Sequence, residues 1–198
     1  MTLAQDVRKL AINELCNSGM EFKNGVFIIK LEIDVLGWLG LNEATRYMYE
    51  INPVVGVRNE AVERLIAELR NRELSNKQIH PTVSTHLGYV MPIFKTYRPW
   101  HFYDGKDFAK KVKKMVNAIN KYGRSFMEAN ISLESLVKAM EKHEVRYHKA
   151  YRLPAVYYLM GKPKLAKDYI LNELTKLGDT HPWDIEYKEY AKKFLERL

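Results

Sequence analysis

The stretch "GVFIIKLEIDV", residues 25–35, alternates apolar with mostly charged residues. Apolar side chains occupy the odd positions from 27 to 35, and Lys30, Glu32 and Asp34 lie between them. Successive side chains of a β-strand point to opposite faces, so this period of two predicts a strand with one buried and one solvated face. Half-buried strands of this kind are typical of antiparallel sheets.

Two more extended segments are expected in the first half of the chain. The segments "ATRYMYEIN", residues 44–52, and "TVSTHLGYVMP", residues 82–92, alternate in the same way. The glycines of "GWLGLNEA" favour a turn between residues 35 and 44, so the first two strands should pair antiparallel. The sequence therefore predicts a small, mainly antiparallel sheet.

Helical signals frame these strands. Thr2 and Gln5 have the spacing of a capping box at the start of a helix over residues 2–17. Asn59 can cap a second helix that ends near residue 73, because apolar residues recur on one face after it. The expected order in the first half is helix, strand, strand, helix, strand.

The second half, residues 93–198, shows helical spacing only. One apolar stripe runs from Phe108 to Phe126, and another helix begins at Ser132. Pro154 should interrupt the segment that follows, since proline removes a backbone donor. A helical pair should flank the next glycine, and a final helix should end the chain.

The expected fold class is α+β, with a single domain over residues 1–198. Its sheet lies in residues 1–92 and its helical half in residues 93–198. Within that half, "PAVYYLMGKPKLAKDYILNEL", residues 154–174, is similar to part of a tetratricopeptide repeat. The residues at the repeat's spacing are Ala155, Tyr158, Gly161, Ala166 and Tyr169. A solenoid needs several such units and the chain shows one, so we expect a single helical hairpin packed on the domain.

The positive charge of the chain is confined to its second half. The net charge is +8. Residues 1–92 carry ten Lys and Arg against eleven Asp and Glu, whereas residues 93–198 carry 22 against 13. This excess favours an acidic partner, either phosphate or a carboxylate-rich protein surface. No apolar run reaches the roughly 18 residues of a membrane span, and the opening lacks the apolar core of a signal peptide, so a soluble, cytoplasmic protein without a membrane partner is expected.

Motifs for catalysis, cofactors and metals are missing from the sequence. It contains neither a glycine-rich phosphate loop nor the G-x-S-x-G pattern of a serine nucleophile. His143 and His148 would lie about 140° apart around one helix, so they cannot easily share a metal ion. We therefore predict no catalytic residue, no cofactor and no metal site. An enzyme whose site is assembled from distant residues stays an alternative.

One candidate anion site lies in "NPVVGVRNEA", residues 52–61, which we interpret as a loop that enters a helix. Arg58 and Asn59 could hold an anion beside the exposed amides of the helix start. The alternative is that Gly56 simply makes a turn at this point.

The stretch "YRPWHFYDGKDFAKKVKKM", residues 97–115, combines aromatic residues with a run of lysines. Tyr, Trp and Arg are enriched at the energetic centres of protein interfaces, and Pro99 with Gly105 marks a loop. We expect Trp100 and Phe102 to anchor this loop in the core. The predicted partner-binding residues are Tyr97, Arg98, His101, Tyr103, Lys110 and Lys114.

A second hypothesis uses the same stretch differently. Interleaved aromatic residues and lysines suit base stacking and phosphate neutralisation. Binding of nucleic acid through a basic helix over residues 106–124 is therefore the alternative to binding of an acidic protein.

Three stretches together, "GVFIIKLEIDV", "YMYEINPVVGVRNEAVERLIAEL" and "PAVYYLMGKPKLAKDYI", resemble small cytoplasmic bacterial immunity proteins, which are encoded beside toxins and neutralise them by binding. The resemblance spans about half of the chain and depends on strand and helix texture plus "NPVVGVR". It implies a non-catalytic protein-binding module and carries over no binding residue. The basic charge of the chain would then imply a toxin with an acidic binding face.

Overall fold

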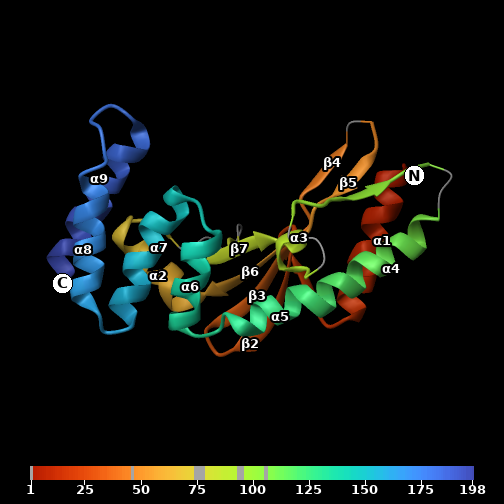
Figure 1. Ribbon diagram of the computed structural model, residues 1–198, viewed down its shortest axis with the longest axis horizontal. Coiled ribbons are helices and arrows are strands. Elements are labelled where there is room, and N and C mark those ends of the chain that lie inside the picture. The colour runs from red at the N-terminus through yellow and green to blue at the C-terminus, as the bar shows by residue number, and fades with distance from the viewer. Residues whose placement is uncertain (1, 46, 74–78, 93–95, 105–106) are drawn as a thin grey trace. The chain divides into compact units, whose positions relative to one another are not determined.

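The computed structural model describes residues 2–45, 47–73, 79–92, 96–104 and 107–198. The chain forms two compact units, and Figure 1 labels most of their helices and strands. Unit 1 comprises Met1–Arg58 and Lys77–Ile131, and unit 2 comprises Asn59–Asn76 and Ser132–Leu198. The sheets lie in unit 1 and unit 2 is built of helices, which confirms the α+β class. The units divide the chain elsewhere than at residue 92, and the single domain over residues 1–198 stays a prediction.

The larger sheet of unit 1 has five strands in the order β1-β2-β3-β6-β7. Antiparallel pairs join β1 to β2, β2 to β3 and β6 to β7. The strand bounds are Glu21–Lys23, Val26–Glu32, Val35–Gly40, Val54–Asn59 and Val83–His86. Asn24 and Gly25 connect β1 to β2 with φ of 52° and 85°, the positive values that a two-residue hairpin turn requires.

The smaller sheet of unit 1 has three strands in the order β4-β5-β8. The strand bounds are Glu43–Thr45, Tyr49–Ile51 and Trp100–Phe102, and both pairs are antiparallel. The strand expected over residues 44–52 is thus a hairpin of two short strands. Its predicted pairing with residues 26–35 is wrong, because the two segments lie in different sheets.

The segment "GVFIIKLEIDV" forms β2 and then turns, so that Ile33 is 91% exposed instead of buried. The glycines that we assigned to a turn lie in β3. A Cβ atom on Gly37 would lie 2.7 Å from both Ile29 Cγ2 and Met127 Sδ. Glycine is required there because a side chain of the neighbouring strand and a side chain of a helix approach its backbone closely.

Two further expectations about strands are corrected. The segment interpreted as a loop before Asn59 is the buried strand β6, and Gly56 lies inside it. The third expected strand stops at His86, and Leu87–Val90 forms the short helix α3. A Cβ atom on Gly88 would lie 2.2 Å from the carbonyl oxygen of Thr96, so α3 passes directly under the backbone of residues 96–98.

Besides α3, unit 1 has longer helices that accompany the sheets. Helix α1, Leu3–Asn17, begins with the predicted capping box of Thr2 and Gln5. It packs along α4, Phe108–Ala118. A π-helical turn, Ile119–Gly123, continues α4 into α5, Arg124–Ala129. A Cβ atom on Gly123 would lie 2.9 Å from Val55 Cγ1, which shows how closely this turn approaches β6.

Unit 2 contains five helices in the part of the chain that the structure describes. Their bounds are Glu60–Leu69 (α2), Leu133–His143 (α6), Arg146–Leu159 (α7), Pro163–Leu174 (α8) and Pro182–Arg197 (α9). Asn59 caps α2 and Ser132 caps α6, as predicted. The pair α7 and α8 packs together around the turn at Gly161, in the place of the predicted hairpin.

Pro154 lies inside α7 and does not interrupt it, contrary to our prediction. A proline at this position cannot donate to the carbonyl of Ala150, one turn earlier. The hydroxyl of Tyr187 donates to that carbonyl instead, with an O···O distance of 3.3 Å. A side chain from α9 thus satisfies the acceptor that proline leaves open inside α7.

Ion pairs join the helices of unit 2. Arg152 of α7 pairs with Glu63 of α2, Nε to Oε1 2.9 Å, and both side chains are nearly buried. Glu173 of α8 is 3% exposed and receives both Arg146 Nε, at 2.9 Å, and Lys176 Nζ, at 2.6 Å. Further pairs are Arg70–Glu186, Arg72–Glu186, Lys188–Asp179 and Arg197–Glu68. Most of the arginines on these helices therefore have a carboxylate of the same unit as partner.

Candidate binding site

Strand β8 carries the centre of the aromatic stretch in unit 1. It pairs with β5 so that His101 lies opposite Glu50 and Phe102 opposite Tyr49. His101 Nε2 lies 3.2 Å from Glu50 Oε2, which fixes the imidazole beside the strand pair. Phe102 is 1% exposed and its ring centroid lies 6.1 Å from that of Tyr49. The strand thus holds one aromatic side chain in the core and a histidine at its surface.

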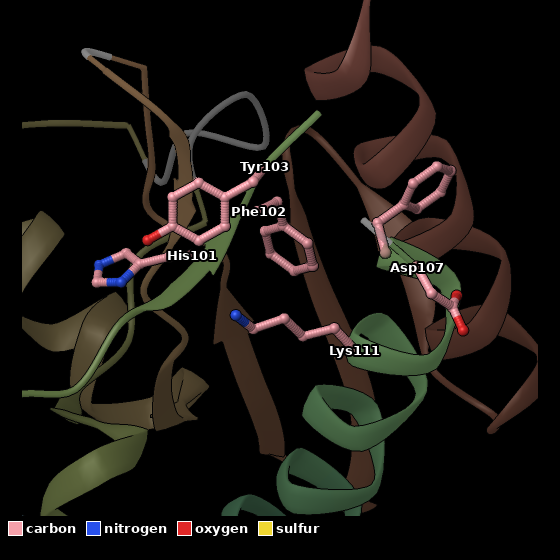
Figure 2. A pocket seen from close by; sticks show the side chains of 6 residues that line it. His101, Phe102, Tyr103, Asp107 and Lys111 are labelled. Atoms are coloured by element: carbon pink, nitrogen blue, oxygen red, sulfur yellow. The ribbon is translucent and has the colours of Figure 1, made fainter. Parts of the chain in front are cut away.

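A pocket of about 350 Å³ opens between this strand and the start of α4 (Figure 2). Its lining residues are His101, Phe102, Tyr103, Asp107, Phe108 and Lys111. Asp107 caps α4, because its carboxylate accepts a hydrogen bond from the backbone N–H of Lys110 at 3.1 Å. In Figure 2 the Lys111 side chain extends from α4 toward the strand, whereas the carboxylate of Asp107 points away from it.

The ammonium group of Lys111 is held against aromatic rings. Its Nζ atom lies 5.8 Å from the ring centroids of both Phe102 and Tyr103, within cation–π distance. Among the residues that the structure describes, Lys111 forms no ion pair. The pocket therefore combines aromatic walls with a positive charge that the described part of the chain does not neutralise.

The remaining lysines of α4 and its continuation stand on the exposed side of the helix. Lys110, Lys114 and Lys121 follow one another at intervals of four and seven residues and share one face. Lys113 is exposed beside them. None of these four lysines forms an ion pair with another described residue. Unit 1 holds 16 Lys and Arg against ten Asp and Glu, a net +6, and unit 2 holds 16 against 14, a net +2.

The structure brings together only some of the residues that we predicted to bind a partner. His101 and Tyr103 line the pocket, and Lys110 and Lys114 lie on the adjoining helix. Tyr97 and Arg98 are exposed but do not line it. The ring of Tyr97 packs edge-on against His86, centroid to centroid 5.2 Å. Burial lowers the pKa of His86, so its imidazole is a neutral neighbour of Tyr97 at pH 7.

The anchor prediction is confirmed for Phe102 and only in part for Trp100. Phe102 is fully buried, whereas Trp100 is only half-buried. We did not predict three of the residues that line the pocket, Asp107, Phe108 and Lys111. The signal for Asp107 was present, since an aspartate three residues before the first lysines can cap a helix. The sequence could not show which lysine turns into the pocket. That depends on how β8 packs against the first turn of α4, which is not a local property of the sequence.

The two residues of the predicted anion site are engaged within the fold. Arg58 is buried at the end of β6, and its Nη1 donates to the carbonyl of His80 at 2.8 Å. The Asn59 side chain accepts from the backbone N–H of Val62 at 3.1 Å, which caps α2. The expectation of an open loop that exposes helix amides is therefore wrong, because this segment is a buried strand that leads directly into a helix.

The histidines give no metal site among the described residues, where no group of three His, Cys, Asp or Glu side chains could hold an ion. His143 ends α6 and His148 lies in α7, so they do not share one helix. His148 Nδ1 lies 3.2 Å from Glu144 Oε2. Across the same described ranges, no helix is both long and apolar enough to cross a bilayer.

The chain matches no known protein-family model, no curated protein and no solved structure. Any function assigned to it therefore depends on the pocket residues and on the lysines of α4.

Proposed function

We propose that the chain is a non-catalytic protein-binding module that captures an acidic partner. The binding surface consists of the pocket in unit 1 together with Lys110 and Lys114 of α4. One observation carries the proposal: α4 has four lysines, none of which forms an ion pair within the described part of the chain, and one of them points onto the aromatic wall of a pocket.

This arrangement costs the isolated protein stability. Lys110 and Lys114 are four residues apart on one helix, and like charges at that spacing destabilise it by about 0.2–0.5 kcal/mol. Lys110 also stands in the first turn, where the helix dipole favours acidic residues. A partner with carboxylates at these positions would remove both penalties. Lys138 and Lys142 of α6 have the same spacing, so the case for a complex depends on the aromatic pocket that lies beside the lysines of α4.

Neutralisation of a toxin is the specific role that we propose. The resemblance to cytoplasmic immunity proteins supports it, and the basic surface fits a toxin with an acidic binding face. Electrostatic complementarity of this kind speeds association, which suits a protein that must capture a harmful partner quickly. Nucleic acid is the competing ligand of the same lysines, because phosphates would also neutralise them.

The test compares two charge reversals with the same helical spacing. Lys110→Glu with Lys114→Glu alters α4, and Lys138→Glu with Lys142→Glu alters the exposed side of α6 in unit 2. Acidic proteins encoded beside the gene are coexpressed one at a time with each variant, and capture is measured by pulldown and calorimetry. We expect the α4 variant to lose about tenfold or more in affinity and the α6 variant to stay within about twofold.

The same protein is titrated with single-stranded DNA and RNA at two salt concentrations. Tight binding whose affinity falls steeply with salt, together with equal capture of proteins by both variants, would contradict the proposal and favour the nucleic-acid alternative. Where the neighbouring gene product is toxic, survival on coexpression gives an independent measurement.

A further inference from the structure

We infer that the pocket receives one aromatic side chain of the partner, and that carboxylates flank this side chain in the partner's sequence. The inference rests on the proposed function and specifies its ligand. An acidic segment with a central Phe, Tyr or Trp would place the ring between β8 and α4 and its carboxylates on the lysines of α4.

The size of the pocket limits what can enter. Its volume of about 350 Å³ is at the lower end of the range for ligand pockets, roughly 300–1,000 Å³. Such a space suits a single large side chain. Residues on either side of that side chain would remain outside, where Lys110 and Lys114 are exposed.

The walls favour an aromatic ring over an aliphatic group. Phe102 forms the buried wall, Phe108 is half-buried, and Tyr103 stands at the rim with 44% of its surface exposed. Rings that meet edge-to-face or offset gain more than their buried area alone provides. Tyr103 is partly exposed at the edge of the pocket, so a ring that enters the pocket can meet it.

The charge in the pocket favours a carboxylate next to that ring. The Lys111 ammonium lies 5.8 Å from the ring centroids of Phe102 and Tyr103, and no described residue forms an ion pair with it. Asp107 of the pocket caps α4, and Glu50 of the neighbouring strand lies against His101, so both carboxylates are already engaged. A carboxylate from a ligand would therefore be the ion-pair partner that the pocket lacks.

The experiment uses the intact protein and three synthetic peptides of equal length. The first has a central Phe among Asp and Glu, the second has Ala in place of that Phe, and the third keeps Phe but replaces the acids by Asn and Gln. Isothermal titration calorimetry measures the affinity of each. We expect the first peptide to bind about tenfold or more tightly than either of the others.

Two variants assign the two parts of the ligand. Tyr103→Ala should weaken the Phe peptide about fivefold or more and leave the Ala peptide within about twofold, because only the first contacts the ring. Lys111→Met should weaken the acidic Phe peptide and leave the neutral Phe peptide within about twofold. Lys138→Met on α6 is the matched control and should change none of these affinities.

Each outcome has a separate meaning. Equal binding of the Phe and Ala peptides, or no binding of any peptide, would overturn the inference about the ring while the coexpression test still judges the proposed function. Equal binding of the acidic and neutral Phe peptides would overturn the flanking carboxylates. If the α4 and α6 variants capture acidic proteins equally in the coexpression test while the Phe peptide still binds, the proposed function would be wrong and the pocket would remain a peptide-binding site.

Discussion

Helices α4 and α7 both lack acidic residues, yet they use their positive charges in opposite ways. In α7, Arg152 pairs with Glu63 and Arg146 pairs with Glu173, so both arginines join helices of unit 2. In α4, the four lysines form no ion pair with any residue that the structure describes. The difference teaches that the arginines of α7 hold helices of unit 2 together, whereas the lysines of α4 have no ion pair in the described part of the chain and, under the proposed function, bind a ligand.

The residue types fit this division. Arginine presents a planar fork that matches a carboxylate in fixed geometry, which suits contacts between packed helices. Lysine is a flexible point charge that remains hydrated until a partner arrives. If the interpretation is right, variants in unit 2 should mainly change stability and variants of α4 should mainly change binding.

The largest loss of stability near the pocket should come from an apolar side chain and not from a charge. We expect Phe102→Ala to lower the free energy of unfolding by about 3–5 kcal/mol, because it empties a fully buried site. Urea denaturation followed by far-UV circular dichroism measures the change. Tyr103→Ala, at the exposed rim, is the control and should cost less than about 1 kcal/mol. Equal losses for the two variants would show that the rim is part of the core.

The next largest effect should come from α7. Arg152→Ala leaves the nearly buried Glu63 without this partner, and we expect a loss of about 3 kcal/mol. Arg197→Ala is matched to it, since Arg197 also pairs with a glutamate of α2 but in an exposed position. That control should lose less than about 1 kcal/mol. A small loss for Arg152→Ala would mean that the arginines of α7 are no more structural than the lysines of α4.

Glu173 gives a prediction with a pH dependence. Burial alone would raise the pKa of Glu173, but hydrogen bonds from Lys176 and Arg146 outweigh it and hold the pKa below its usual range. A depressed pKa in the folded state stabilises the fold above the unfolded-state value of about 4.3, and this contribution is lost as pH falls through the folded-state pKa. Glu173→Gln should therefore cost about 2 kcal/mol at pH 7.

Melting temperatures of the wild type and Glu173→Gln, measured from pH 7 down to pH 3, test this sign. The difference in melting temperature between the wild type and Glu173→Gln should be constant near pH 7 and should become smaller only below about pH 4. A difference that persists unchanged to pH 3 would show that the carboxylate charge of Glu173 does not contribute.

The smallest effect should have the opposite sign. Lys110→Glu places an acid in the first turn of α4 and replaces a repulsive pair with Lys114 by an attractive one. We expect stability to rise by about 0.5–1 kcal/mol while binding of an acidic partner falls. The melting temperature of Lys110→Gln should lie between those of the wild type and Lys110→Glu. A decrease in melting temperature for Lys110→Glu would mean that this lysine serves the fold after all.

Local signals in the sequence predicted part of the fold. The caps at Thr2, Asn59 and Ser132 are confirmed, because a cap depends on residues within one turn of the helix. The alternation in residues 25–35 identified a strand for the same reason. Its end was placed too late, since a hairpin turn at Ile33 can follow the same alternating pattern.

Distant contacts explain the main errors. Gly37 and Gly56 suggested turns, but each lies in a strand where another part of the chain approaches its backbone. Pro154 suggested a helix end, but the Tyr187 hydroxyl accommodates it from α9. Met127 and Tyr187 are far in sequence from the residues that they contact, so the single sequence could not show these contacts.

The sequence predicted where the candidate site lies along the chain but not how its side chains are arranged. The stretch of residues 97–115 drew attention to the right part of the chain, because aromatic residues beside lysines are unusual in composition alone. It could not show that Tyr97 packs on His86 while Lys111 turns toward Phe102. Those choices depend on the close passage of residues 96–98 over α3 and on the pairing of β8 with β5.

The π-helical turn, Ile119–Gly123, explains why we extended the apolar stripe to Phe126. Met115 and Met127 are both fully buried, yet twelve residues apart in a regular helix they would face about 120° apart. If only eleven residues separated Met115 from Met127, the two side chains would face about 20° apart. The turn thus absorbs one extra residue, and it places Met127 against β3 while Phe126 is only half-buried.

Helix α4 and its continuation therefore resemble an α-helix with one inserted residue, in which the residues after the insertion still pack against the sheet. A chain that lacks Lys121 should form an uninterrupted α-helix with Met115 and Met127 still inward, so its far-UV spectrum and cooperative unfolding should persist. Deletion of Lys113, which precedes Met115, leaves Met115 and Met127 twelve residues apart and should instead rotate the buried Val112 away from the core and weaken cooperative unfolding. Homologous chains of both lengths could then share one core, and sequence alignments across this helix should be gapped at residues 119–123.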